Sequence, residues 1–201
     1  MHFFLKIAAW LFHPLFIGIY GVLLYFSVTP RFVQPEIVYG KLLVVSILTL
    51  MIPILFFFIL RNLNWVQSIE LHSVNERKAP LMILAVLLLL MLRVVFDFYN
   101  YPELYYYFLG VLFTVITAWI LVLFKFKASL HMMGISGLAM YAIALSIHFN
   151  INILMTIAFL LFACGWVASS RLHSKSHTTI ELIIGFFIGW IPQLLLVNYW
   201  L

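Results

Sequence analysis

Residues 151–200 read INILMTIAFLLFACGWVASSRLHSKSHTTIELIIGFFIGWIPQLLLVNYW. Two long apolar runs, 151–168 and 179–200, are separated by a short polar loop. A helix needs about 20 apolar residues to cross the hydrocarbon core of a bilayer, with a range of about 17 to 25. Both runs meet that length, so this stretch predicts two antiparallel membrane-spanning helices joined by a polar turn.

The composition of the whole chain points to the same class of protein. Of 201 residues, 66% are hydrophobic and only 8% are charged, whereas a soluble domain carries about 25% charged residues. A polytopic integral membrane protein is therefore predicted, located in the bacterial inner (cytoplasmic) membrane. The net charge of +5 is ordinary for such a protein with basic loops, and nothing indicates nucleic-acid binding. The one cysteine, Cys164, excludes an intramolecular disulfide.

The spacing of apolar runs predicts an all-α bundle of six or seven transmembrane helices that form a single domain. The runs lie at about 3–26, 42–60, 80–97, 104–124, 132–148, 151–168 and 179–200. The first run is longer than the apolar core of a signal peptide and is interpreted as a retained helix. His13-Pro14 lies inside it and predicts a kink.

Three polar loops, 61–79, 125–131 and 169–178, are expected on one side of the membrane, because two membrane crossings separate each of them from the next. Most of the charged and histidine side chains of the chain are in these loops. The positive-inside rule accounts for cations on a cytoplasmic face, but it does not account for three histidines and a glutamate in and just after two short loops. A functional site at this membrane surface is therefore expected.

The loop 169–178 and the start of the next run contain the strongest candidate residues. His177 and Glu181 are four positions apart, so on a helix they share a face. A carboxylate at that spacing can hold one ring nitrogen of His177 and leave the other free to attack or to ligate. Arg171 lies six residues upstream and could bind an anionic oxygen. These residue types predict phosphate chemistry.

A second group of candidates opens the fifth apolar run. Lys127, Ser129 and His131 occur within five residues at an expected helix start. A hydroxyl and backbone N–H groups at a helix N-terminus favour anion binding, and His131 could give a proton to a leaving group.

These two groups resemble motifs of the type-2 phosphatidic acid phosphatase superfamily, the membrane lipid phosphate phosphatases. The third motif of that family is Ser-Arg, five residues, His, three residues, Asp. Residues 170–181 match it with Glu181 in place of Asp. The second motif is Pro-Ser-Gly-His, and residues 128–131 read Ala-Ser-Leu-His.

The first motif of the family is Lys, six residues, Arg-Pro. The nearest stretch here is Asn-Glu-Arg-Lys-Ala-Pro at residues 75–80. Ala79 holds the place of the Arg and His72 that of the Lys, so Arg77 or Lys78 would have to substitute.

The resemblance implies a metal-independent phosphatase without a cofactor, which acts on a lipid phosphate or an isoprenoid diphosphate through a phosphohistidine. It implies that His177 is the nucleophile, that Glu181 orients it, and that His131 protonates the leaving group. The residues that it implies for phosphate binding are Arg171, Ser129, Lys127, Arg77 and Lys78.

Two alternatives follow from the same residues. Leu130 replaces the glycine of the second motif and Ala79 the arginine of the first, so an inactive relative that binds anionic head groups or scaffolds a membrane complex is the main alternative. The second is a haem or metal protein, for which His173, four residues before His177, gives a metal-pair spacing. The sequence does not specify the lipid, the side of the membrane or the oligomeric state.

Overall fold

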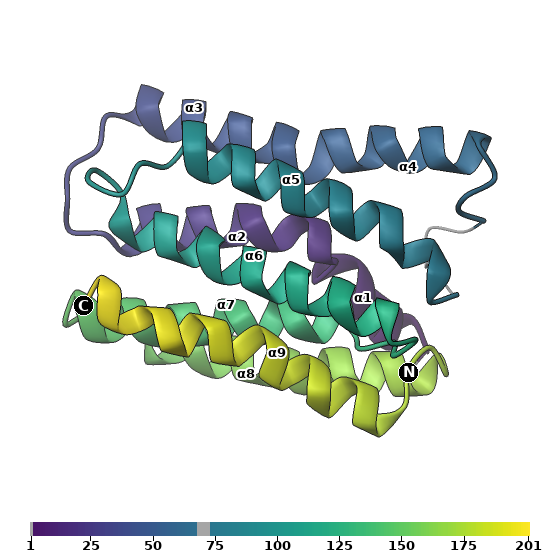
Figure 1. Ribbon diagram of the computed structural model, residues 1–201. Helices are drawn as coiled ribbons and strands as arrows, with labels where there is room; N and C mark the ends of the chain where they lie inside the picture. The colour runs from purple at the N-terminus through teal and green to yellow at the C-terminus, as the bar shows by residue number, and fades with distance from the viewer. Residues whose placement is uncertain (1, 68–72) are drawn as a thin grey trace.

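A computed structural model describes residues 2–67 and 73–201, and these residues form helices and no strand (Figure 1). The all-α bundle predicted from the sequence is confirmed. In chain order the elements are α1 (His2–Leu11), α2 (Pro14–Val28), α3 (Pro35–Ser46), η1 (Ile47–Met51), α4 (Ile52–Asn62), η2 (Asn75–Arg77), α5 (Lys78–Val94), α6 (Pro102–Leu123), α7 (Leu130–His148), α8 (Leu154–His173), α9 (Thr179–Leu196) and η3 (Val197–Tyr199).

The lengths of the helices agree with an integral membrane protein. Within the described residues, five helical segments are long and apolar enough to cross a membrane, and a sixth span results if α1 and α2 are counted together. One of the five is the continuous 28-residue segment formed by α3, η1 and α4. The remaining expected span corresponds to α5, whose 17 residues reach only the lower end of the spanning length.

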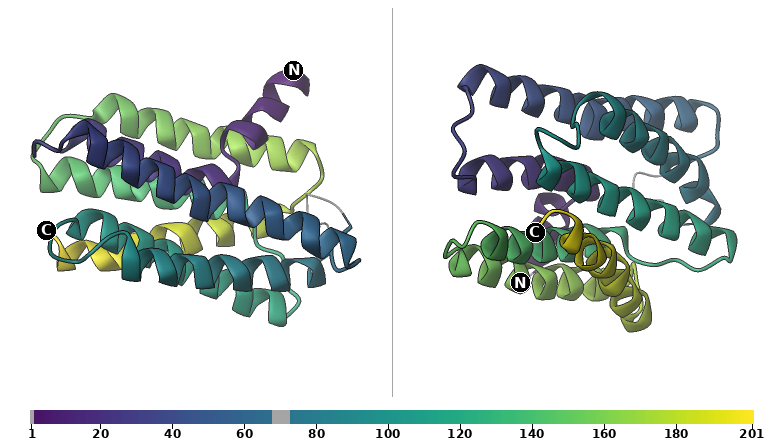
Figure 2. Two further views of the ribbon diagram at one scale, coloured as in Figure 1. Left: turned by 90° about the horizontal axis from the view of Figure 1, so that it is seen from above. Right: turned by 60° about the vertical axis from the view of Figure 1, so that its left-hand side comes forward.

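The first expected span, 3–26, is divided by a sharp bend. The axes of α1 and α2 differ by 66°, and in the left view of Figure 2 α1 projects away from the rest of the bundle. Pro14 causes the break because it has no N–H to donate, and because in a continuous helix its ring would collide with the carbonyl group four residues earlier. His13 is extended, with φ −64° and ψ 138°, as expected before a proline. Residues 12–14 form an elbow between the two helices.

The most extensive packing between two helices of the described residues joins α7 and α9, which run side by side in Figure 1. Two glycines of α9 permit this approach. A Cβ on Gly189 would overlap the carbonyl oxygen of Met133, and a Cβ on Gly185 would lie 3.0 Å from the carbonyl oxygen of Ser129. The start of α7 is therefore packed backbone to backbone against α9 at Gly185 and Gly189, which brings the loops before the two helices together.

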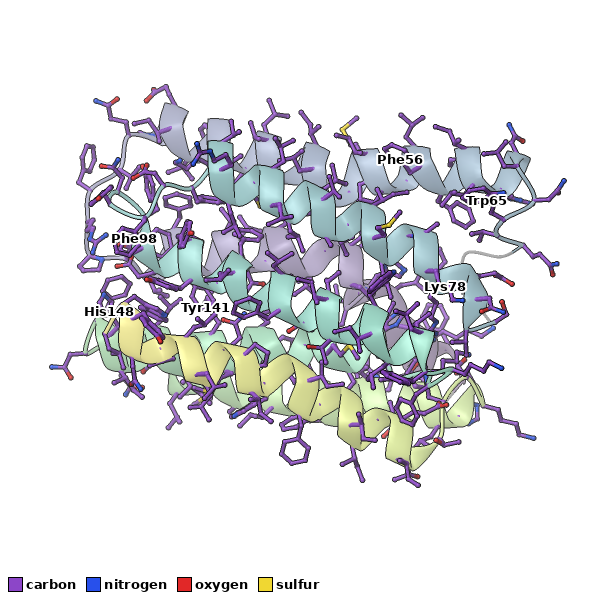
Figure 3. All side chains as sticks on the ribbon, viewed as in Figure 1. Phe56, Trp65, Lys78, Phe98, Tyr141 and His148 are labelled. Carbon is purple, nitrogen blue, oxygen red and sulfur yellow. The ribbon has the colours of Figure 1, made fainter. Side chains whose placement is uncertain are left out.

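The polar connections gather at one end of the bundle, as the parity of the spans predicts. The described parts of the α4–α5, α6–α7 and α8–α9 connections all lie at the right of Figure 1. Figure 3 shows Lys78 near that end and His148 at the other. At the far end Glu103 is fully buried, with Arg31 Nη2 at 2.8 Å and His148 Nε2 at 3.1 Å from its Oε1. This cluster ties together the α2–α3 linker, α6 and α7.

Candidate active site

The start of α9 fixes the position of His177. Thr178 is the N-cap of α9, and its side chain accepts a hydrogen bond from the backbone N–H of Glu181 in a reciprocal capping box. Glu181 Oε2 accepts the backbone N–H of Thr178 at 3.0 Å and lies 2.9 Å from His177 Nδ1. Because a carboxylate only accepts, Nδ1 carries the proton and Nε2 keeps its lone pair.

His177 is also held in its neutral form. Its side chain is buried, and this burial is the main cause that lowers its pKa to about 4. The carboxylate of Glu181 opposes the shift, while the charges of Arg77 and Lys127 add to it. At neutral pH, His177 therefore presents an unprotonated nitrogen within a group of cations, which is the state that a nucleophile requires.

Of the two basic residues that could replace the first-motif arginine, Arg77 is the one placed in the core of the site. Arg77 is 4% exposed, and its Nη1 donates to the carbonyl oxygen of Ala128 at 2.9 Å. Lys78 follows at the start of α5 and is exposed. The structure therefore brings Arg77, and not Lys78, to the second motif. His72, aligned with the lysine of the first motif, lies outside the described residues.

Ser129 connects the two halves of the site through its backbone. It is fully buried at the N-cap of α7, where its Oγ accepts from the backbone N–H of Met132 at 3.4 Å. Its own backbone N–H donates to the carbonyl oxygen of Glu181 at 3.2 Å. The hydroxyl retains its hydrogen for a second acceptor, because capping uses only the oxygen.

Two further cations surround this junction. Lys127 Nζ donates to the carbonyl oxygen of Ser176 at 3.3 Å, so it crosses the loop directly before His177. Arg171 is in the last turn of α8, and its charge acts on Arg77, His131 and His13.

His131 faces the N-terminal segment. Its Nε2 lies 3.2 Å from the carbonyl oxygen of Ala9 in α1, and its ring meets that of His13 edge to face, with the centroids 5.2 Å apart. A carbonyl only accepts, so Nε2 carries a proton and Nδ1 is the atom left for chemistry. The charge of His177 also acts on this ring.

Sequence reasoning missed the contribution of α1 and His13. The dipeptide His13-Pro14 predicts a kink but gives no sign that α1 folds back along α8. Phe4 stacks on Trp166 with ring centroids 4.3 Å apart, and Trp166 Nε1 donates to the Phe4 carbonyl at 3.1 Å. This docking places Ala9 and His13 against His131.

The described residues contain no group of three or more His, Cys, Asp or Glu side chains that could hold a metal ion. His173, the second member of the possible metal pair, is exposed on the last turn of α8. Comparisons with protein-family models, with curated proteins and with solved structures found no match to this chain.

Proposed function

We propose that this chain is a divergent type-2 phosphatidic acid phosphatase that removes phosphate from a membrane lipid phosphate or an isoprenoid diphosphate. The observation that carries the proposal is the pair formed by His177 and Glu181, in which Nδ1 is bound 2.9 Å from a carboxylate oxygen. The opposite nitrogen, Nε2, is left as a nucleophile among Arg77, Lys127 and other basic groups. This combination suits phosphoryl transfer.

In the first step, His177 Nε2 attacks phosphorus and a P–N bond forms. The P–O bond to the leaving group breaks, and its electron pair stays on the leaving oxygen. His131 enters this step as an imidazolium, a state that the negative charge of the bound phosphate favours. The leaving oxygen takes the proton from its Nδ1, while its Nε2–H stays bound to the Ala9 carbonyl. The phosphohistidine is a cation because Nδ1 keeps its proton, and the carboxylate of Glu181 stabilises it.

In the second step, water attacks phosphorus and the P–N bond breaks. His131 Nδ1 takes the proton from water, so both histidines return to their starting states and inorganic phosphate leaves. No metal is required, because the charge that develops on the phosphoryl oxygens is met by side-chain cations and the hydroxyl hydrogen of Ser129. Arg77, Lys127 and Arg171 supply those cations.

The principal alternative is an inactive relative that binds anionic lipid head groups. It is favoured by Leu130, which stands where the family has a glycine, and by the hydrogen bond of Arg77 to the Ala128 carbonyl at 2.9 Å. In that case the cations bind a phosphate that is never transferred.

The test is phosphate release by purified protein in detergent, with a chelator present. Phosphatidic acid, phosphatidylglycerol phosphate and undecaprenyl diphosphate are offered to the wild type and to His177→Ala. Chelator-resistant release that the variant lacks supports the phosphatase. Head-group binding without release from any of the three supports the inactive relative, and release that the chelator abolishes supports metal chemistry instead.

A further inference from the structure

The bend between α1 and α2 leaves a hollow at the surface of the bundle. Its volume is about 540 Å³, which lies within the range of about 300 to 1,000 Å³ that is usual for small-molecule sites. The left view of Figure 2 shows how α1 leaves the bundle at this bend. The lining side chains come from both helices and include Phe3, Lys6, Ile7, Trp10, Phe16 and Tyr20. None of them belongs to the candidate active site.

α1 has two apolar faces, and within the described residues only one of them is covered by protein. The covered face consists of every fourth residue, namely Phe4, Ala8 and Phe12. Ala8 and Phe12 are buried there, and Phe4 stacks on a tryptophan of α8. The face towards the hollow contains Phe3 and Trp10, which are 79% and 77% exposed. A helix that is apolar around most of its circumference needs an apolar neighbour on its second face too, and for this chain the bilayer supplies it.

The direction of α1 is that of a helix in the membrane interface. Its ten residues are about 15 Å long. Because its axis makes an angle of 66° with that of α2, it advances by only about 6 Å along α2. The carbonyl oxygen of Ala9 lies 3.2 Å from Nε2 of His131 in the first turn of α7, so α1 is at the membrane face that carries the candidate site. An amphipathic helix in this position lies at the boundary between head groups and acyl chains.

Lys6 is the one charged side chain among the residues that line the hollow. It is exposed, and no side chain of the described residues forms an ion pair with it. Trp10 is one helical turn away, and Tyr20 closes the end of the hollow at the elbow by donating to the carbonyl oxygen of Leu11 at 2.9 Å. Tryptophan and tyrosine are the aromatic residues that favour the head-group level of a membrane. The hollow therefore combines one unpaired cation with an apolar and aromatic lining.

We propose that this hollow binds one phospholipid with an anionic head group, whose phosphate contacts Lys6 and whose acyl chain covers Trp10 and Phe16. The lining selects this occupant by its chemistry. A soluble anion would leave most of the apolar surface uncovered, and a neutral hydrocarbon would leave the ammonium group without a partner in an apolar environment, which is costly. A phosphate joined to an acyl chain satisfies both parts of the site.

The bound phospholipid is a structural ligand and not a substrate. It packs on α1 from a face other than the one that meets α8, and it thereby holds α1 in its docked position. The phosphate-binding cations of the candidate active site take no part in it. The inference therefore goes beyond the proposed phosphatase and does not depend on turnover.

Three variants of the full-length protein separate this site from other cationic surfaces. Lys6→Gln removes the charge of an exposed side chain and keeps a good helix former. Lys125→Gln is the matched control, because Lys125 is also exposed and lies in the α6–α7 connection at the same end of the bundle. Arg77→Ala reports any head group that binds at the candidate active site.

Phosphatidylglycerol and phosphatidylcholine are titrated against each protein in neutral detergent, and the rise in unfolding temperature is recorded. The wild type and Lys125→Gln should bind phosphatidylglycerol more tightly than phosphatidylcholine. Lys6→Gln should lose about fivefold in apparent affinity for phosphatidylglycerol, the scale of one lysine at an anionic membrane surface, and change less than about twofold for phosphatidylcholine. Equal binding of both lipids by the wild type, or the same loss in Lys125→Gln, overturns the inference. A preference that Arg77→Ala loses and Lys6→Gln keeps overturns it as well, because the head group then binds at the candidate active site.

The location of the lipid is tested on the unmodified protein. Phosphatidylglycerol with a photoreactive group in its acyl chain is cross-linked to the wild type, and the labelled peptides are identified by mass spectrometry. Label should concentrate in residues 3–20 and should be displaced by unlabelled phosphatidylglycerol but not by inorganic phosphate. Label spread evenly over the exposed faces of the other helices overturns the inference. Displacement by inorganic phosphate alone also overturns it, because the site would then bind a soluble anion.

Discussion

His177 Nδ1 and the backbone N–H of Thr178 share one acceptor, Glu181 Oε2, at 2.9 and 3.0 Å. A single carboxylate oxygen thus caps α9 and sets the tautomer of the proposed nucleophile. The two roles are coupled because Glu181 is the third residue of the helix that His177 precedes. Substitutions at this position can separate them.

The variant Glu181→Gln should keep the helix cap but should no longer hold His177 in the tautomer with its proton on Nδ1. Glutamine serves in capping boxes, but its amide can donate to Nδ1 and so move the proton to Nε2. We expect a fall in kcat on the order of ten-thousandfold, the scale of a wrong-tautomer substitution in a serine protease. The control Thr178→Ala should instead cost about 1 kcal/mol of stability and keep most of the activity per folded molecule. Wild-type kcat in Glu181→Gln would show that the carboxylate does not orient His177.

Arg77 and Lys78 are adjacent cations, of which the first is buried and the second exposed. Substitutions at the two positions therefore form a matched pair. Arg77→Ala removes a buried donor to the Ala128 carbonyl and leaves that acceptor unpaired, which costs about 1 to 3 kcal/mol. It should also lower phosphate affinity. Lys78→Ala changes an exposed side chain and should stay within about 0.5 kcal/mol of wild type. Thermal unfolding and phosphate titration measure both, and equal effects of the two changes would contradict the assignment of Arg77 to the site.

The α7–α9 contact predicts a strong effect of one methyl group. In Gly189→Ala the new Cβ meets the backbone carbonyl of Met133, whereas a Cβ on Gly165 in α8 meets no atom within 4 Å. Overpacking of this kind costs about 1 to 3 kcal/mol or more, while an unobstructed Gly→Ala change in a helix is neutral or stabilising by up to about 1 kcal/mol. Unfolding temperatures in detergent give the comparison. Gly189→Ala as stable as Gly165→Ala would mean that the two helices are further apart than described.

The low pKa of His177 predicts a pH-dependent part of the folding stability. Burial lowers that pKa from 6.5 to about 4, so between these values the unfolded chain binds more protons at this position than the folded protein. The contribution is therefore complete above about pH 6.5 and is lost as the pH falls towards 4. His177→Gln lacks this contribution. The unfolding temperature of the wild type relative to the variant should therefore be constant above about pH 7 and fall as the pH is lowered below that value. A difference independent of pH from about 4.5 to 7.5 would contradict the lowered pKa.

The sequence predicted the helices well because the length of an apolar run is a local property. Pro14, assigned from the sequence to a kink, and Pro35, not assigned, are the first residues of α2 and α3. The second expected span, 42–60, lies within a longer helical segment that starts at Pro35 and includes the polar residues Glu36 and Lys41. The 66° bend and the return of α1 along α8 could not be predicted, because a proline breaks a helix without specifying where the preceding segment docks.

The candidate site was predictable where its contacts are local. His177 and Glu181 are four residues apart, and the capping box fixes their geometry from within α9. The choice between Arg77 and Lys78 depends on how the chain enters α5 beside the start of α7, and residue type does not encode this. His13 was assigned only to a kink, since its partner His131 lies 118 positions further along the sequence.

The most direct test of the proposed chemistry is a search for the covalent intermediate. Wild type and His177→Ala are mixed with lipid diphosphate that carries a labelled terminal phosphate, quenched in the steady state, and digested for mass spectrometry. The account predicts label bound to protein through an acid-labile bond, located on His177 and missing in the variant. Rapid phosphate release by wild type with no label on His177, or with label on another residue, would contradict it.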